Sequence, residues 1–290
     1  MISASMVKEL REISGAGMMD CKKALEESNG DMDKASDWLR ENGFLKATKK
    51  ESRIAAEGLA NIYIDGNTAV IIEINSETDF VSKNEEFRAM LDTFGNIILK
   101  SKVNSVDEAL SLECESGTLN DLLVSKTAKI GEKLSFRRFE RVTKKDNEVF
   151  GSYLHMGGKI AVLSVLSNTT EDVAKDISMH IAAMKPEYLS ERDISGDIID
   201  ALKESFKVEA LNEGKPANIA EKMIEGKLKK YYKEVCLNLQ PFVKSDDIDV
   251  KTFVERSGGS IISMIRYAVG EGIEKRNENF AEEVMNQINK

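Results

Sequence analysis

The chain reads ANIYIDGNTAVIIEINSETDFVSK at residues 60–83. Apolar residues recur at every second position in 60–64 and again in 70–74, on either side of an Asp-Gly-Asn turn, and this pattern predicts a β hairpin. Ser82 and Glu85 have the spacing of a capping box, so we expect a helix to begin there. A strand, a turn, a strand and a helix in this order predict an α+β fold. The apolar stripe of the helix would consist of Phe87, Met90, Leu91, Phe94 and Ile98.

A related pattern occurs later in the chain. Residues 149–155 and 159–167 have the composition of two strands, and the turn Met156-Gly157-Gly158 separates them. Helical spacing of apolar residues follows at 171–184. The repeated order of hairpin and helix predicts two related α+β subdomains.

The amino-terminal segment has a helical pattern. Apolar residues recur at helical spacing through residues 1–45, with glycine-containing breaks between three short runs. Asp31 is a candidate N-cap, and Gly43 is a candidate end for the third helix. A basic segment at residues 46–55 is expected to be a solvated linker or helix. We therefore expect a small three-helix module ahead of the strands.

Two further helical regions lie in the last third of the chain. Residues 197–232 contain two apolar-periodic runs around Asn212-Glu213-Gly214-Lys215-Pro216, which predicts a helical hairpin. Its sparse apolar stripe and many lysines suit either a protruding arm or a self-association element. Residues 278–288 are expected to form a terminal helix.

Composition narrows the class of protein. Hydrophobic residues make up 41% of the 290 residues and charged residues 31%, which suits a folded soluble chain. No stretch is apolar for long enough to span a bilayer, and a signal pattern is missing, so a cytoplasmic location is expected. The three cysteines are widely spaced, which disfavours a disulfide framework or a structural zinc site. A net charge of −9 disfavours nucleic acid as a partner.

The sequence offers little sign of covalent chemistry. No glycine-rich loop ends in Lys and Ser or Thr, and no dinucleotide-binding glycine motif follows a strand. His155 stands beside a glycine turn without a nucleophile motif nearby, so a packing or surface role explains it more simply. His180 falls on a predicted helix and is expected to be buried or half-buried. We therefore expect no catalytic residue, no metal site and no cofactor.

One polar connection carries an aromatic residue. Thr78, Asp79, Phe80 and Val81 lie between the second strand and the following helix. Phe80 could fold back under the helix as a hydrophobic staple. Alternatively, it could be an exposed anchor for a partner, worth on the order of 2 kcal/mol when a partner removes it from water.

Several motifs in this order resemble the elongation factor Ts family. Thr78-Asp79-Phe80-Val81 is similar to that family's T-D-F-V motif, and residues 14–25 are similar to its opening module, with Ser14 where many members have Thr. The resemblance extends over nearly the whole chain. Further matches occur at residues 179–186, 214–226, 240–242 and 269–275.

The resemblance implies a domain organisation that agrees with the patterns above. Residues 1–45 would form a module similar to a ubiquitin-associated domain, followed by the linker 46–55. The core would consist of an N-subdomain and a C-subdomain, with a helical dimerisation arm in the latter, and a helical module would end the chain. The corresponding ranges are 56–145, 146–270, about 193–232, and 271–290.

The resemblance also implies a partner and its contacts. The partner would be the GTPase elongation factor Tu, from which the chain would promote GDP release, with a possible homodimer through the arm. The motif Thr78, Asp79, Phe80 and Val81 would dislodge the partner's Mg²⁺. Other implied contact residues are Met18, Met19, Lys23, His155, Gly157 and Gly158, the last three in a turn that varies among family members.

Two other classes of protein stay open on the residues alone. A nucleic-acid adaptor could use the lysines and arginine at 46–53 together with the lysines at 227–233, and its binding would be weak and sensitive to salt. A metabolic enzyme could use an acid–base site without a familiar motif, and it would turn over a small substrate in the absence of a protein partner.

Overall fold

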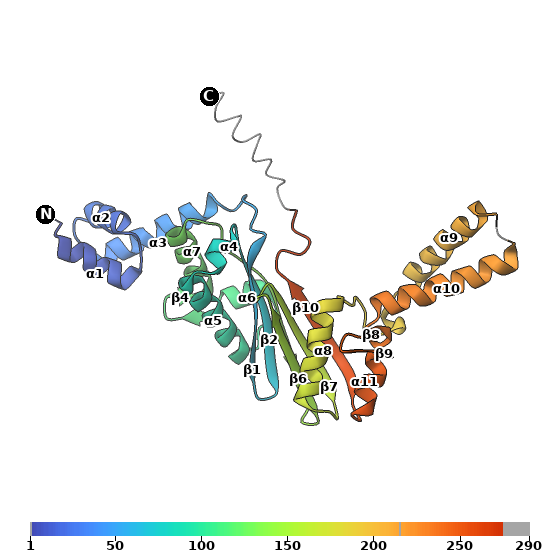
Figure 1. Cartoon of the computed structure of the whole chain (residues 1–290). Helices are drawn as coiled ribbons and strands as arrows, with labels where there is room; N and C mark the ends of the chain where they lie inside the picture. Colours follow the sequence, from blue (N-terminus) through green and yellow to red (C-terminus); the bar gives the residue numbers. More distant parts are fainter. Residues whose placement is uncertain (1, 215, 275–290) are drawn as a thin grey trace. The chain divides into compact units, whose positions relative to one another are not determined.

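The computed structural model describes residues 2–214 and 216–274, and Figure 1 shows that helices and sheets are combined along the chain. The predicted α+β class is confirmed. The chain divides into two compact units. The first combines residues up to Tyr63 with Val70–Arg141 and the segment that begins at Ala268, and the second combines Ile64–Ala69 with Val142–Tyr267.

Three helices begin the first unit: α1 (Ala4–Ser14), α2 (Met18–Glu27) and α3 (Met32–Thr48). They enclose a small core of Leu10, Cys21, Ala24, Leu25 and Ala35. Asp31 is the N-cap of α3, as predicted, because its carboxylate accepts a hydrogen bond from the Lys34 N–H at 3.1 Å.

The predicted end of the third helix at Gly43 is wrong. The helix α3 continues to Thr48, and Gly43 is buried within it. A Cβ atom on Gly43 would lie 3.7 Å from a methyl group of Val124 on α7 (Leu119–Ile130). Gly43 therefore lies where α3 packs closely against α7, and the first residues of the predicted linker belong to the helix.

A three-stranded sheet forms the centre of the first unit. Its strands are β1 (Glu57–Asp65), β2 (Thr68–Ser76) and β5 (Ser135–Thr143), in the order β1-β2-β5. The predicted hairpin corresponds to β1 and β2. Between β2 and β5 the chain forms α4 (Asp79–Ser82), α5 (Glu85–Lys100), α6 (Val106–Leu110), β3 (Glu113–Cys114), β4 (Gly117–Thr118) and α7.

The helix α5 covers one face of this sheet. All five residues of the predicted apolar stripe are buried, and they share a core with Val70, Ile72 and Ile74 of β2. The ring of Phe94 meets that of Phe136 edge to face, with the centroids 5.1 Å apart.

The predicted capping box is wrong. Asn84, not Ser82, is the N-cap of α5, and its side chain accepts a hydrogen bond from the Glu86 N–H at 2.8 Å. The short helix α4 intervenes, so that Ser82 is its last residue and donates a hydrogen bond to the Asp79 carbonyl.

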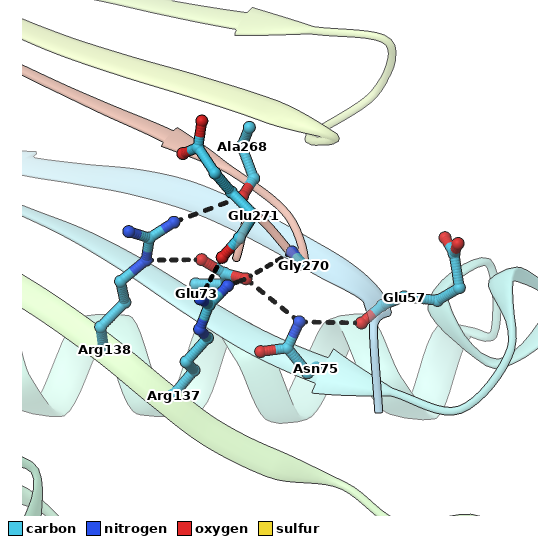
Figure 2. A network of polar contacts seen from close by, with 8 residues as sticks. All are labelled: Glu57, Glu73, Asn75, Arg137, Arg138, Ala268, Gly270 and Glu271. Atoms are coloured by element: carbon cyan, nitrogen blue, oxygen red, sulfur yellow. Dashed lines mark hydrogen bonds and ion pairs between the residues drawn. The ribbon is translucent and has the colours of Figure 1, made fainter. Parts of the chain in front are cut away.

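A buried carboxylate connects three distant segments of the first unit (Figure 2). Glu73 on β2 has no exposed surface, and its oxygens accept hydrogen bonds from Arg137 at 3.0 Å and from Arg138 at 2.7 Å, both on β5. The Gly270 N–H donates to the same carboxylate at 2.9 Å, and Asn75 donates to it at 3.1 Å. Burial raises the pKa of the Glu73 carboxyl, but these donors lower it by more, so the net pKa lies below that of a free glutamate.

Gly270 fits this position because it is a glycine. Its φ is +74°, and a Cβ atom there would lie 2.0 Å from the Ala56 carbonyl oxygen. Arg138 also donates to the Ala268 carbonyl at 3.3 Å, and Arg137 donates to the Glu271 carbonyl. The segment after β10 (Ser260–Ala268) is thereby fixed to the sheet of the first unit.

The second unit is built on the sheet β10-β7-β6. Strands β6 (Glu148–His155) and β7 (Ile160–Ser167) pair antiparallel, from Glu148 opposite Ser167 to His155 opposite Ile160, and α8 (Glu171–Met184) packs on them. This agrees with the predicted second hairpin and helix. The small sheet β8 (Pro241–Phe242) and β9 (Ser245–Asp249), with α11 (Val250–Arg256), completes the core around Phe242.

Two long helices follow α8 in the sequence. The 3₁₀ turn η1 (Glu191–Asp193) leads into α9 (Gly196–Asn212), which packs against α10 (Ala217–Val235), and η2 (Leu237–Leu239) follows. The predicted helical region therefore forms two helices in contact. The predicted terminal helix at 278–288 lies outside the described residues.

His180 is buried in the second unit, as predicted. Its Nδ1 accepts a hydrogen bond from the Val243 N–H at 3.2 Å, so its Nε2 carries the proton that is donated to Gln240 Oε1 at 2.9 Å. Burial lowers the pKa of His180, and the hydrogen bond to Gln240 opposes this only in part. The folded protein therefore favours the neutral ring.

Replacement of Glu73 should destabilise the first unit. Glu73→Gln removes the charge that both arginines face, and since the arginines are partly exposed we expect a loss of about 3 kcal/mol in the free energy of unfolding at pH 7. Because the folded pKa is depressed, the wild-type advantage should be complete above about pH 4.3, the pKa of an unfolded glutamate, and should be lost as the pH falls from there through the lower pKa of the folded carboxyl. Urea denaturation measures both effects. The control Glu12→Gln alters only an exposed ion pair with Lys8, and equal losses in both variants would contradict the prediction.

Stability should also depend on pH near neutrality. The pKa of His180 is lower in the folded than in the unfolded protein, so the unfolded chain binds more protons and stability falls as the pH drops below about 6.5. The slope should approach about 1.4 kcal/mol per pH unit in urea denaturation between pH 7.5 and 5.5. His180→Gln should remove this slope, and His155→Gln, at an exposed position, should retain it. A slope that persists in His180→Gln would assign the effect to another group.

Candidate functional site

The loop between β2 and α5 divides its side chains between water and the core. Phe80 is 79% exposed, whereas Val81 packs against the core of the first unit. The two residues are neighbours in the single turn of α4, so they point in different directions. The possibility that Phe80 folds back as a staple is therefore wrong, and its ring is presented to solvent.

Charged groups surround the exposed ring. The Lys83 ammonium lies 2.7 Å from an Asp79 carboxylate oxygen and 5.7 Å from the centre of the Phe80 ring. Asp79 and Lys83 are four residues apart on a helical path, so this geometry is local. The loop thus combines an apolar ring, a carboxylate and an ammonium group on one short turn.

Thr78 is held from outside the loop. Its N–H donates to Glu132 Oε2 at 2.9 Å and its hydroxyl donates to Glu132 Oε1 at 2.7 Å. Sequence patterns did not reveal Glu132, because no local spacing relates two residues 54 positions apart. Lys83 could have been found from its spacing to Asp79.

The amino-terminal candidates lie on the outer face of α2. Met18 is 58% exposed and Met19 73% exposed, while Cys21 and Ala24 of the same helix face the bundle core. A core role for the two methionines is therefore excluded. Lys23 lies 5.7 Å from the centre of the Trp38 ring on α3.

The remaining candidates form the turn between β6 and β7 of the second unit. His155 and Gly157 are exposed, Gly158 is buried, and Met156 between them is 72% exposed. His155 Nδ1 lies 3.3 Å from the Tyr153 hydroxyl. Beside His155 is a shallow hollow of about 290 Å³, which Tyr153, Met179, Ala182, Ala183, Val243 and Lys244 also line.

The candidates therefore occupy three elements. Thr78, Asp79, Phe80 and Val81 share α4 and its N-cap, Met18, Met19 and Lys23 share α2, and His155, Gly157 and Gly158 share one turn. Within residues 2–214 and 216–274, no helix combines the length and apolar character needed to cross a bilayer. The same described residues contain no cluster of three or more His, Cys, Asp or Glu placed to bind a metal ion.

A sequence model of one protein family, described as Elongation factor TS, matches residues 77–271. The chain belongs to the elongation factor Ts family. The matched region begins one residue before Thr78 and ends in the segment that Glu73 fixes. It includes the loop with Phe80 and the turn with His155, and it begins after the helices that carry Met18, Met19 and Lys23.

Membership of this family confirms the resemblance seen in the sequence. Elongation factor Ts proteins are nucleotide exchange factors for elongation factor Tu in translation elongation. Exchange of this kind uses binding energy and requires no covalent step, which is consistent with a loop that displays an aromatic ring and a carboxylate.

The two hydrophobic residues of α4 should respond differently to truncation. Val81→Ala removes methyl groups that pack on the core and should lower the free energy of unfolding by about 1 kcal/mol. Phe80→Ala removes a ring that water already surrounds and should change it by less than about 0.5 kcal/mol. Urea denaturation of both variants provides the measurement. A larger loss for Phe80→Ala would show that the ring packs in solution.

Proposed function

We propose that this member of the elongation factor Ts family binds elongation factor Tu in its GDP form, displaces Mg²⁺ and promotes GDP release so that GTP can bind. The exposed ring of Phe80, with the Asp79 carboxylate beside it, is the observation that supports this mechanism best. The protein would act in the cytoplasm through binding energy alone. Neither a membrane nor nucleic acid is required.

Thermodynamic linkage sets the requirement for such a factor. A partner that binds the empty GTPase more tightly than the GDP form must weaken GDP binding by the same factor. A strong shift in occupancy needs several kcal/mol of differential affinity, and one aromatic insertion supplies about 2 kcal/mol. Several contact regions must therefore act together.

Phe80 would insert between helices of the partner's nucleotide domain. The Asp79 carboxylate would then disturb the environment of the Mg²⁺ ion, which prefers oxygen ligands in a strict octahedral geometry. Thr78 and Val81 would hold these two residues in place from either side. A bound Mg²⁺ bridges phosphate and protein oxygens, so its displacement would directly weaken the binding of GDP to elongation factor Tu.

The other candidates would supply the remaining affinity. The three amino-terminal helices would act as a module similar to a ubiquitin-associated domain, and Met18, Met19 and Lys23 would contact a neighbouring helix of the partner. Exposed methionines suit this role because their side chains are flexible and polarisable. His155, Gly157 and Gly158 would contact a second region, and the segment after Gly270 a third.

The helices α9 and α10 would form an arm for self-association. Val208, Leu211 and Ile219 are 50%, 62% and 44% exposed, so this helix pair carries apolar surface that a second copy could cover. A homodimer would then present two exchange sites.

Truncation of Phe80 tests the mechanism. Phe80→Ala should slow the release of fluorescent GDP from elongation factor Tu roughly thirtyfold at saturating factor, which corresponds to about 2 kcal/mol. Ile262→Ala removes an exposed apolar side chain from β10 and serves as the control, with an unchanged rate expected. The proposed role of Phe80 fails if its removal leaves the saturated rate as it was.

A further inference from the structure

The loop that carries Phe80 is held by hydrogen bonds that run in both directions between two segments. Glu132 uses both carboxylate oxygens to accept from Thr78, at 2.9 Å from the N–H and 2.7 Å from the hydroxyl. In the opposite direction, the Lys133 N–H donates a hydrogen bond to the Glu77 carboxylate at 2.5 Å. Two adjacent residues of the loop thus pair with two adjacent residues of the turn after α7, and we refer to these four residues as the latch.

The latch also reaches the segment that follows α3. The Lys133 ammonium donates to the Glu51 carbonyl at 2.6 Å and to the Arg53 carbonyl at 3.0 Å, and the Arg53 guanidinium donates to Glu77 at 3.2 Å. Three segments of the first unit therefore meet at Glu77 and Lys133. Hydrogen bonds to charged groups are the stronger kind, so this junction restricts the backbone on the amino-terminal side of α4.

The carboxyl-terminal side of the same loop is fixed to α7. Glu86, in the first turn of α5, lies 3.2 Å from the Lys126 ammonium and 2.7 Å from the Lys129 ammonium, both on α7. The last turns of α7 and the residues directly after it therefore hold the loop on both sides of α4. Phe80 lies between these two attachments and remains exposed.

The behaviour of Thr78 indicates that the latch directs α4. Thr78 is the N-cap of α4, where a threonine hydroxyl ordinarily accepts a hydrogen bond from its own helix. Here its side chain makes no capping bond, and its hydroxyl donates to Glu132 instead. The helix therefore lacks a local side-chain cap, and its N-cap residue is oriented by a carboxylate from another part of the unit.

We infer that Glu132 is a positioning residue for nucleotide exchange. It orients Thr78, and through Thr78 it orients Asp79 and Phe80, before elongation factor Tu binds. This inference rests on the proposed role of Phe80. A side chain that must enter a partner is most effective when its backbone is already held in the productive orientation. Glu132 itself does not need to touch elongation factor Tu.

Exchange kinetics of Glu132 variants test the inference. Glu132→Ala should lower the maximal rate of fluorescent GDP release from elongation factor Tu at least fivefold, while the factor concentration at half-maximal rate changes less than twofold, because other contact regions still bind. Glu132→Gln keeps one acceptor oxygen and should give an intermediate rate. Thr78→Ser keeps the hydroxyl that donates to Glu132 and should exchange faster than Thr78→Val, which lacks it.

A double-mutant cycle separates positioning from general destabilisation. Because the hydroxyl and the backbone N–H of Thr78 both donate to Glu132, and Thr78→Val removes only the first bond, Glu132→Gln combined with Thr78→Val should slow exchange by less than the product of the two single effects. The matched control is Glu108→Gln, since Glu108 accepts a hydrogen bond from the Asn104 N–H at 2.9 Å in the same unit but away from α4. Its exchange rate should equal that of the wild type. Circular dichroism at the assay temperature establishes that each variant is folded.

The outcomes distinguish the positioning role of Glu132 from the proposed insertion of Phe80. A normal maximal rate in Glu132→Ala, or in Glu132→Gln if the alanine variant does not fold, together with a slowed Phe80→Ala, would overturn the role of Glu132 alone. Fully additive effects of Glu132→Gln and Thr78→Val would do the same. A normal rate in Phe80→Ala would overturn both proposals.

Discussion

The buried carboxylate of Glu73 is the constraint on which the first unit depends. An unpaired charge in the interior is very unfavourable, so Glu73 can be buried only where Arg137, Arg138 and the Gly270 N–H meet it. This requirement fixes the register of β2 against β5, because a shift by one residue would turn Glu73 to the other face. It also fixes the segment after β10, which lies 197 positions away in sequence.

The loop with Phe80 begins directly where this fixed strand ends. β2 runs to Ser76, and the next residues enter the latch formed by Glu77, Thr78, Glu132 and Lys133. Neighbouring residues therefore do different things: some hold the loop to the protein, and one presents its side chain to solvent. Val81 and Thr78 face the protein, whereas Phe80 faces water. A loop of this kind can present a ring without burying it or leaving its backbone loose.

The sequence was most informative where interactions are local. Alternation predicted the first hairpin, two strand-like runs around a glycine turn predicted the second, helical spacing predicted the stripe from Phe87 to Ile98, and a four-residue motif indicated the loop with Phe80. The predicted helix boundaries were wrong where tertiary contacts, and not local sequence, determine where a helix begins or ends. Gly43 resembles a helix end but lies within α3 because α7 packs there, and Ser82 resembles an N-cap but belongs to α4.

The supporting residues of the loop could not have been predicted from the sequence. Glu132 and Thr78 are brought together by the tertiary fold, in which α7 packs against α3 and α5, and no periodicity reports a pair 54 positions apart. The sequence also could not show which of Phe80 and Val81 is exposed, because the two residues are adjacent and both apolar. Only the folded turn places Phe80 in solvent and Val81 against the core.

The solvent-facing ring also bears on colloidal behaviour. The Phe80 ring has an ammonium group 5.7 Å from its centre and a carboxylate on the preceding residue. A single apolar group with charged neighbours is too small a patch to start aggregation. The net charge of −9 adds repulsion between two copies of the chain at longer range. The loop can therefore keep this apolar group uncovered without itself promoting association.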